Sequence, residues 1–215
     1  KGGDGKKEND KTDAEALDGR TVTALSEKAK ELGCYIFTGS FVEKSGENYY
    51  NTSILLDREG KNIAEYRKIH LFTYKSREPE ILTPGKNITV ADTEFGKIGL
   101  ATCYDLRFPE LFRKMTVEMG AEYFLITSCW PYPRIEAWNV LNKARALENT
   151  CYLISCNAVG VSSGIRAAGH SQIVDPWGNL IAGSGYEETI VSAEISHDEV
   201  LRIRKEFPVL NDRRL

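Results

Sequence analysis

The sequence predicts an α/β protein in which two β-sheets pack together and helices cover their outer sides. Helix-like and strand-like segments alternate along most of the chain, and hairpins interrupt that alternation. Of the 215 residues, 41% are hydrophobic, which is enough for a sizeable core. Because hairpins do not suit a simple parallel, doubly wound sheet, a two-sheet sandwich fits the order of elements better. We expect a single domain over residues 1–215.

The first part of the chain is expected to begin with a polar loop over residues 1–13, which are nearly all charged, glycine or polar. An amphipathic helix follows over Ala14–Leu32, and Gly33 ends it. After three strands comes an irregular loop, His70–Gly85, of the kind that often carries functional residues. The three strands are expected at Cys34–Val42, Asn51–Leu56 and Ile63–Lys68.

The apolar pattern restarts after this loop and predicts a second series of strands and helices. Residues 206–215 lie beyond the last of these and are expected to form a C-terminal arm. The expected elements are a hairpin of Ile88–Asp92 with Lys97–Thr102, a helix Pro109–Met119, a strand Ala121–Thr127, a helix Ala137–Asn149, a strand Cys151–Asn157, a hairpin over Gln172–Ala182, a strand Thr189–Ile195 and a helix Asp198–Lys205.

Composition excludes several classes of protein. A net charge of -3 gives no reason to expect nucleic acid or an anionic membrane surface as a partner. No apolar run approaches the roughly 20 residues that cross a bilayer. Five cysteines without a CxxC pair argue against a disulfide framework and against a structural zinc site. We therefore expect a cytoplasmic protein that acts on a small molecule.

One cysteine, Cys103, lies where an apolar strand ends and a helix is about to begin. Pro109 suits the first turn of that helix. At such a turn, backbone N–H groups can face an anion, and the pKa of a thiol can be lowered so that it becomes nucleophilic. Position alone is equally compatible with a small buried hydrophobic residue.

Two further residues of catalytic type precede this cysteine. Lys68 ends an apolar strand 35 positions earlier (103 − 68), and two strands whose ends meet at one edge of a sheet can bring such residues together. A lysine beside a thiol favours the thiolate and can stabilise an oxyanion. Glu78 lies on the intervening loop and can hold the lysine or handle a proton.

Together with their neighbours, these residues resemble the nitrilase superfamily of carbon–nitrogen hydrolases. The resemblance extends from about Leu17 to the end of the chain. It is carried by Tyr66-Arg-Lys68-Ile-His-Leu-Phe, by Glu78 seven residues before Gly85, by Cys103-Tyr-Asp-Leu-Arg-Phe-Pro-Glu110, by Trp138 and by Ala144-Arg-Ala-Leu-Glu-Asn149. The resemblance implies a four-layer α-β-β-α sandwich, no metal and no organic cofactor. It also implies a homodimer or higher homo-oligomer, in which the tail beyond Phe207 reaches over a partner.

The resemblance also implies roles for individual residues. In the family a cysteine attacks an amide or nitrile carbon, a glutamate is the general base and a lysine stabilises the tetrahedral intermediate. Carried over by motif, the nucleophile is Cys103, the lysine is Lys68, and Glu78 is the family's second glutamate. The backbone N–H of Tyr104 would complete the oxyanion hole. No residue matches the general base, and we expect the sequence to lack the family's first strands and helix.

Within the superfamily, three motifs are similar to the omega-amidase branch, which hydrolyses the terminal amide of 2-oxoglutaramate and 2-oxosuccinamate. They are Trp130-Pro-Tyr-Pro-Arg134, Cys156-Asn-Ala-Val-Gly160 and Gly169-His-Ser171. Such substrates need a cation for the remote carboxylate. Arg134 is the candidate, because a guanidinium can bind a carboxylate through two hydrogen bonds. Trp130 is expected to form a wall beside the nucleophile.

Three alternatives remain open from the sequence. N-carbamoyl and aliphatic amide hydrolases of the same superfamily share the chemistry. A cysteine–histidine enzyme could use His70 as its base, because His70 lies two residues beyond Lys68. A non-catalytic binding or assembly module is the third, since the general base has no match.

Overall fold

The structure is a computed structural model that describes residues 13–162 and 164–214. They form two compact units, Lys1–Thr89 and Val90–Leu215. Both units combine helices with β-sheet, and the larger sheet is mixed, so the predicted α/β class is confirmed. The polar loop expected at residues 1–13 lies outside the described residues except for its last position.

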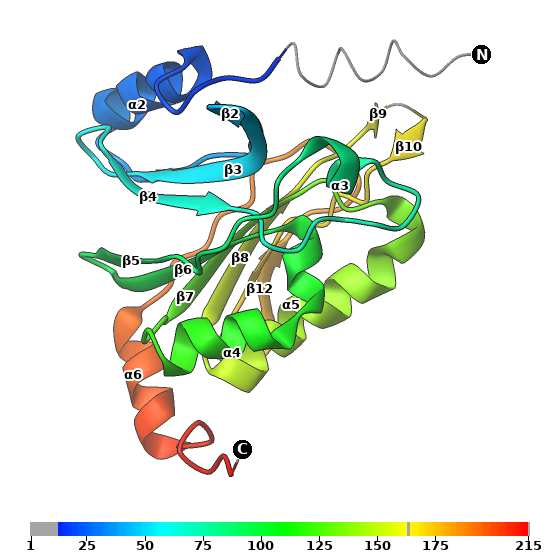
Figure 1. Ribbon diagram of the computed structural model, residues 1–215. Helices are drawn as coiled ribbons and strands as arrows, with labels where there is room; N and C mark the ends of the chain where they lie inside the picture. The colour runs from blue at the N-terminus through cyan, green and yellow to red at the C-terminus, as the bar shows by residue number, and fades with distance from the viewer. Residues whose placement is uncertain (1–12, 163, 215) are drawn as a thin grey trace. The chain divides into compact units, whose positions relative to one another are not determined.

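The first unit is an antiparallel sheet with one long helix on it. Strand β3 is central and pairs with each of the other three strands. Helix α2 lies along one face of this sheet (Figure 1). Its Val22 and Ala29 pack with Ile54 and Leu56 in a buried cluster, which follows from the apolar stripe of an amphipathic helix. The elements are α2 (Arg20–Leu32), β1 (Ile36–Phe37), β2 (Phe41–Ser45), β3 (Asn48–Leu56), β4 (Asn62–Arg67) and a short helix α3 (Glu78–Ile81).

Helix α2 begins six residues later than predicted, and Glu15 explains the difference. The backbone of Glu15 pairs with β2, where its N–H donates to the Val42 carbonyl at 3.0 Å. Its carboxylate accepts hydrogen bonds from the N–H and the hydroxyl of Thr21, both at 2.8 Å, in the first turn of α2. Acidic groups stabilise a helix N-terminus, so the helix starts beyond Glu15. The strand predicted at Cys34–Val42 is likewise split, into β1 and β2.

The second unit contains a six-stranded sheet in the order β12-β11-β8-β7-β6-β5. Strands β6, β7 and β8 are parallel, and the outer strands are antiparallel. Helices α4 and α5 cover one face of this sheet (Figure 1), where Phe112 of α4 meets Phe124 of β7 edge-to-face at 5.1 Å. The elements are β5 (Val90–Thr93), β6 (Gly96–Thr102), η1 (Cys103–Arg107), α4 (Pro109–Val117), β7 (Tyr123–Ser128), η2 (Tyr132–Arg134), α5 (Ile135–Asn149), β8 (Tyr152–Asn157), β9 (Val161–Ser162), β10 (Ile165–Arg166), β11 (Gln172–Val174), β12 (Leu180–Gly183) and α6 (His197–Glu206).

The strand predicted at Thr189–Ile195 is wrong. Residues 189–195 are all described and form no strand, and Ile190 is 94% exposed. An alternating pattern makes a strand only where a neighbouring strand can complete the ladder. The small β9–β10 hairpin, by contrast, was not predicted.

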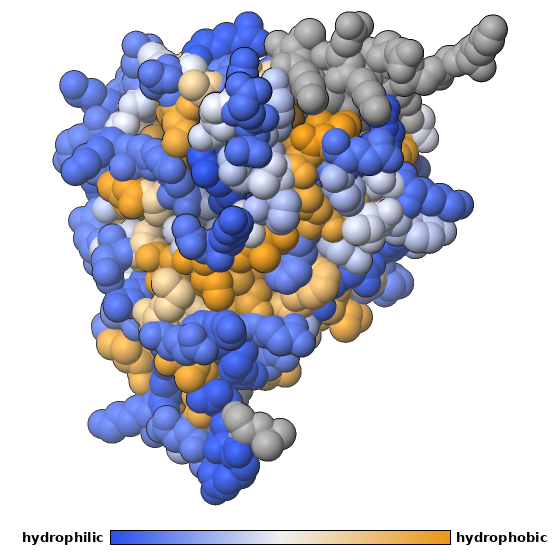
Figure 2. Space-filling view, in the orientation of Figure 1, coloured by the Kyte–Doolittle hydropathy of each residue, from blue (hydrophilic) through white to orange (hydrophobic). Residues whose placement is uncertain are grey.

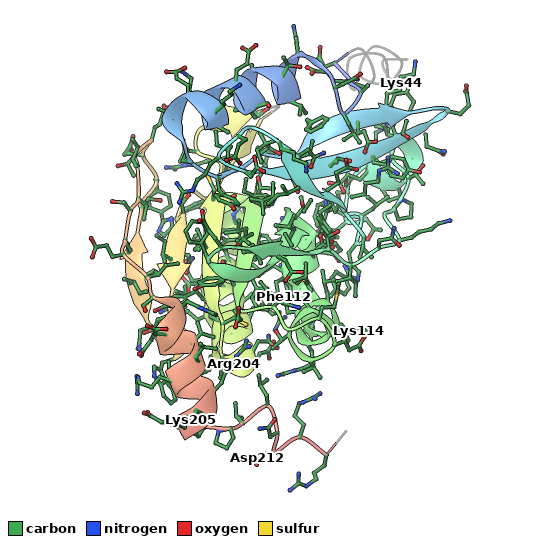
Figure 3. All side chains as sticks on the ribbon, turned by 90° about the vertical axis from the view of Figure 1, so that its left-hand side faces the viewer. Lys44, Phe112, Lys114, Arg204, Lys205 and Asp212 are labelled. Carbon is green, nitrogen blue, oxygen red and sulfur yellow. The ribbon has the colours of Figure 1, made fainter. Side chains whose placement is uncertain are left out.

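Polar side chains anchor helix α6 to the segment before β7 and to the end of α5. The guanidinium of Arg204 donates to the Ala121 carbonyl at 2.7 Å and also reaches the Thr150 carbonyl at 3.3 Å. His197 lies 2.9 Å from Glu122 at the other end of the helix. Figure 3 shows Arg204 directed toward the sheet and Lys205 on another side of α6. The outer surface of α6 and of the segment after it is mainly hydrophilic (Figure 2).

Candidate active site

Cys103 begins the short 3-10 helix η1 directly after β6. Its φ of 49° lies in the left-handed region, where a residue with a side chain is strained by about 1 kcal/mol. The carboxylate of Asp105, itself fully buried, accepts the N–H of Thr102 at 3.0 Å and holds the turn in shape. Cys103, with its half-buried thiol, therefore follows the carboxyl end of an inner strand at a tight, locally braced turn.

Tyr104 is the second residue of the same 3-10 helix. Its ring packs edge-to-face on Phe108 at 5.3 Å, which fixes the side chain against the next turn. The first N–H groups of a helix point out of its N-terminal end, and the N–H predicted to bind the oxyanion belongs to this group. The sequence placed Cys103 and Tyr104 before a helix, but it did not reveal that η1 precedes α4.

Lys68 and Glu78 lie together in the first unit. The Lys68 side chain is only 1% exposed, and its Nζ lies 2.7 Å from Oε2 of Glu78. The same oxygen accepts the N–H of Phe72 at 2.9 Å. Backbone hydrogen bonds hold Lys68 on both sides, from its own N–H to Asn51 and from Gly85 to its carbonyl, both at 2.8 Å. A buried ammonium needs such a partner, and Glu78 also fixes the position of the Lys68 side chain.

An ion pair between the buried Glu43 and the partly exposed Arg67, which the sequence did not reveal, precedes this lysine. The carboxylate of Glu43, 1% exposed, binds the guanidinium of Arg67 through both oxygens and also accepts the Thr52 hydroxyl at 2.6 Å. Hydrogen bonding to Glu43 raises the pKa of Arg67, while burial opposes this effect. The Arg67 guanidinium also lies 4.0 Å from the ring centroid of Tyr50. These contacts hold the end of β4, from which Lys68 follows. Glu43 is 24 residues from Arg67, so no local pattern could identify the pair.

Trp130 and Arg134 come together in the loop after β7. The indole Nε1 of Trp130 donates to the carbonyl of Arg134 at 2.9 Å, so the tryptophan braces the turn that carries the arginine. Trp130 is 2% exposed; the guanidinium of Arg107 lies 4.9 Å from its ring centroid, and the ring centroid of Trp138 lies 5.5 Å away. Trp130 is thus mainly a packing residue of this loop, and a direct contact with substrate stays a prediction.

The carboxyl ends of adjacent parallel strands place the nucleophile and this loop at one edge of the sheet. Thr102 of β6 pairs with Thr127 of β7, and Cys103 and the loop of Trp130 follow directly. Ligand sites of parallel sheets lie at this edge. A cavity of about 350 Å³ lies beside α5. It is separate from the candidate active site, because none of the predicted site residues lines it.

In the part of the chain that the structure describes, no group of three or more His, Cys, Asp or Glu side chains is placed to hold a metal ion. Among the described helices, none is both long and apolar enough to cross a lipid bilayer.

Comparison with known proteins defines the class to which this fold and this cysteine turn belong. The profile of the carbon-nitrogen hydrolases matches residues 4–205. The chain therefore belongs to the carbon-nitrogen hydrolases of the nitrilase superfamily and is an amidase-like member of it.

Individual relatives narrow the comparison. The chain is 38% identical over 207 residues to a 2-oxoglutaramate amidase of Paenarthrobacter nicotinovorans, which covers 93% of this chain and 70% of the relative. It is 40% identical over 196 residues to a 2-oxoglutaramate amidase of Bacillus subtilis (strain 168), and this match covers 91% of this chain and 75% of the relative. An omega-amidase of Xenopus laevis is 35% identical over 209 residues, with 94% and 75% covered.

Solved structures agree with the fold. The crystal structure of Nit3 of Saccharomyces cerevisiae, a nitrilase superfamily member, matches with a TM-score of 0.88 and 31% identity, covering 97% of this chain and 78% of Nit3. An amidase variant of Nesterenkonia sp. AN1 matches with a TM-score of 0.75 and 26% identity, covering 88% of this chain and 72% of the amidase. That amidase carries the acetamide moiety of fluoroacetamide covalently at its active-site cysteine.

Proposed function

We propose that this chain is a thiol amidohydrolase of the omega-amidase type. Its substrate would be a small carboxylated amide, 2-oxoglutaramate or 2-oxosuccinamate, from which it releases ammonia. The observation that carries the proposal is Cys103, which lies at a strained turn from strand to helix in a chain that is 38% and 40% identical to two 2-oxoglutaramate amidases. The four-layer arrangement and the cytoplasmic location stay predictions.

The proposed reaction passes through a thioester. The thiolate of Cys103 adds to the amide carbon, and Lys68 and the N–H of Tyr104 stabilise the resulting oxyanion. Collapse of this intermediate breaks the carbon–nitrogen bond, and the nitrogen leaves as ammonia after it takes up a proton. Water then cleaves the thioester, which gives the 2-oxo acid and restores the thiol. Glu78 holds the Lys68 side chain in place through a hydrogen bond. The general-base glutamate of the family is assigned to no residue of this sequence.

Arg134 is proposed to bind the substrate's remote carboxylate. It follows the strand beside β6, which ends just before Cys103, and its carbonyl accepts a hydrogen bond from Trp130. A guanidinium offers a carboxylate two parallel hydrogen bonds, which orient the substrate as well as attract it.

The test is ammonia release from 2-oxoglutaramate by the wild-type protein and by Cys103→Ala. We expect the variant to lose at least about a thousandfold in kcat, because the covalent route is removed. Cys129→Ala, which removes an exposed thiol with no proposed role, should keep wild-type activity. Turnover by the Cys103 variant, or no amide hydrolysis by the wild-type protein, would overturn the proposal.

Arg134→Ala tests the substrate class. For 2-oxoglutaramate we expect KM to rise about 10- to 100-fold, as for loss of a charged hydrogen-bonded contact, while a neutral amide of similar length is unaffected. Arg134→Lys keeps the charge but cannot form two parallel hydrogen bonds. Its KM for 2-oxoglutaramate should therefore lie between the values of the wild-type protein and of Arg134→Ala. Equal losses on both amides would show that Arg134 does not bind the carboxylate.

Aliphatic amide hydrolysis is the second candidate, favoured by the similarity to the Nesterenkonia amidase, one structure of which holds butyramide. A wild-type protein that prefers butyramide to 2-oxoglutaramate would support this alternative.

The predicted homo-oligomer is proposed to form through α5. Its exposed residues Glu136, Val140, Lys143 and Leu147 follow one stripe of the helix. If two copies of α5 pair antiparallel about a two-fold axis, Glu136 of one copy meets Lys143 of the other, with Val140 near the centre. The stripe is thus complementary to itself in charge. A role of the 206–215 arm in this interface stays a prediction.

Charge reversal tests this pairing by sedimentation. Lys143→Glu should weaken the dimer, because like charges then face each other, and adding Glu136→Lys in the same chain should restore it. Lys114→Glu, an exposed change on α4, serves as the control. A monomeric wild-type protein, or a dimer indifferent to Lys143→Glu, would contradict the proposal.

A further inference from the structure

We infer that Asn157 is a positioning residue for the loop that carries Trp130 and Arg134. Asn157 is the last residue of β8, and its side chain is part of none of the roles described above. The inference rests on the proposed function, because it concerns the loop assigned to the substrate's carboxylate.

The side chain of Asn157 joins two loops. It is 4% exposed, its Oδ1 accepts the N–H of Trp130 at 2.7 Å, and its Nδ2 donates to the carbonyl of Gly169 at 2.7 Å. The first bond belongs to the loop after β7 and the second to the segment before β11. One buried amide therefore sets the separation of two loops that are about 40 residues apart in sequence.

The two loops also bind each other beside this amide. The backbone carbonyl of Trp130 accepts a hydrogen bond from the N–H of Ala168 at 2.7 Å, and Pro131 forms an isolated antiparallel β-bridge with Ala167. From Trp130 the contacts continue to Arg134 through the indole N–H. Asn157 thus acts on Arg134 through the backbone and the ring of Trp130, without touching the substrate in our proposal.

The chemistry of the position requires one acceptor and one donor. An ionised aspartate offers acceptors only, so Asn157→Asp places an oxygen against the Gly169 carbonyl and breaks that bond. A protonated aspartate has an O–H that can donate to the same carbonyl. Burial raises the pKa of such a carboxyl group, so protonation is accessible at moderately low pH. Alanine can restore neither bond at any pH.

The experiment measures KM and kcat for Asn157→Asp and Asn157→Ala on 2-oxoglutaramate and on butyramide. We expect both variants to raise KM for 2-oxoglutaramate about 10- to 100-fold near neutral pH, with little change for butyramide. Between about pH 8 and about pH 5.5, KM of the aspartate variant should return toward the wild-type value, and KM of the alanine variant should not. The matched control is Asn149→Ala, which removes another fully buried amide of the same unit, bonded within α5 to the Arg145 carbonyl.

Hydrogen exchange separates this inference from the proposed function. We expect the backbone amides of Trp130 and Ala168 to exchange at least about tenfold faster in Asn157→Ala than in Asn149→Ala. The reason is that Asn157→Ala removes the two hydrogen bonds by which Asn157 joins the loops, which we call the clamp. If the wild-type protein hydrolyses no amide, the proposed function fails, and the exchange result alone then supports or overturns the clamp. If the wild-type protein is active, an unchanged KM in both Asn157 variants, or an equal loss in the Asn149 control, overturns the inference.

Discussion

At the scale of single residues, the pairing of Lys68 with Glu78 shows how one carboxylate compensates a buried ammonium. The ammonium is buried, and the structure shows Glu78 as its counter-ion at 2.7 Å. Removing one partner of such a pair leaves the other charge without compensation, which costs more than an exposed pair contributes.

Glu78→Gln should therefore destabilise the protein by about 2 kcal/mol in urea unfolding, since Glu78 itself is partly exposed, and should lower kcat by about a hundredfold. Glu80→Gln is the matched control on the same short helix. The Glu80 side chain is 58% exposed and that of its partner Arg77 is 35% exposed, so the expected loss is no more than about 0.5 kcal/mol. Equal destabilisation by the two substitutions would show that the Lys68 pair has no special weight.

A second prediction at this scale concerns the reactivity of Cys151. Burial raises the pKa of this thiol to about 11, although Arg204, 3.1 Å from the sulfur, opposes the shift. The thiolate is the reactive form, and at pH 8 its fraction is about a thousandth for such a pKa. Iodoacetamide with mass-spectrometric mapping should label the exposed Cys129 and Cys156 well before Cys151. Early labelling of Cys151 in the folded protein would contradict this order.

At the scale of elements, α6 illustrates a helix held by polar contacts at the ends of other elements. Arg204 donates to the carbonyls of Ala121, Asn149 and Thr150, which lie before β7 and at the end of α5. Carbonyl groups at a helix C-terminus lack partners inside the helix and attract a cation. The same helix carries Arg202, which forms ion pairs with Glu199 and Glu206 of α6 itself.

Arg204→Met should lower the free energy of unfolding by about 1–3 kcal/mol, because several buried carbonyls lose a charged donor. Arg202→Met, which breaks only exposed pairs within the helix, should change it by no more than about 0.5 kcal/mol. Thermal or urea unfolding of the two variants under the same conditions measures the difference. A larger effect of Arg202→Met would mean that α6 is not anchored through Arg204.

At the scale of the whole molecule, the prediction of a single domain over residues 1–215 can be tested by unfolding. All three tryptophans, Trp130, Trp138 and Trp177, belong to the second unit, so their fluorescence follows that unit alone. Far-UV circular dichroism follows both units. A single domain predicts coincident urea transitions by the two methods. Separate midpoints would show that the two units unfold independently and would make the single-domain prediction wrong.

The sequence by itself determined what depends on neighbouring residues. Gly33 marks the end of α2, where it takes a φ of 59° as a left-handed cap. The apolar run before Cys103 predicted a strand, and Pro109 correctly predicted the first turn of a helix. Periodicity and helix caps depend on contacts within a few positions, and the order of motifs is read directly from the chain. The family and the candidate nucleophile could therefore be recognised before any coordinates.

Only the tertiary structure decided which distant side chains meet. It paired Glu43 with Arg67, buried the ring of Trp130 and placed Asn157 between two loops. It also left residues 189–195 without a strand, although the sequence predicted one there. A strand needs a partner, and a buried polar group needs a donor or acceptor from another part of the chain. Such partners are supplied by topology, which no local pattern contains.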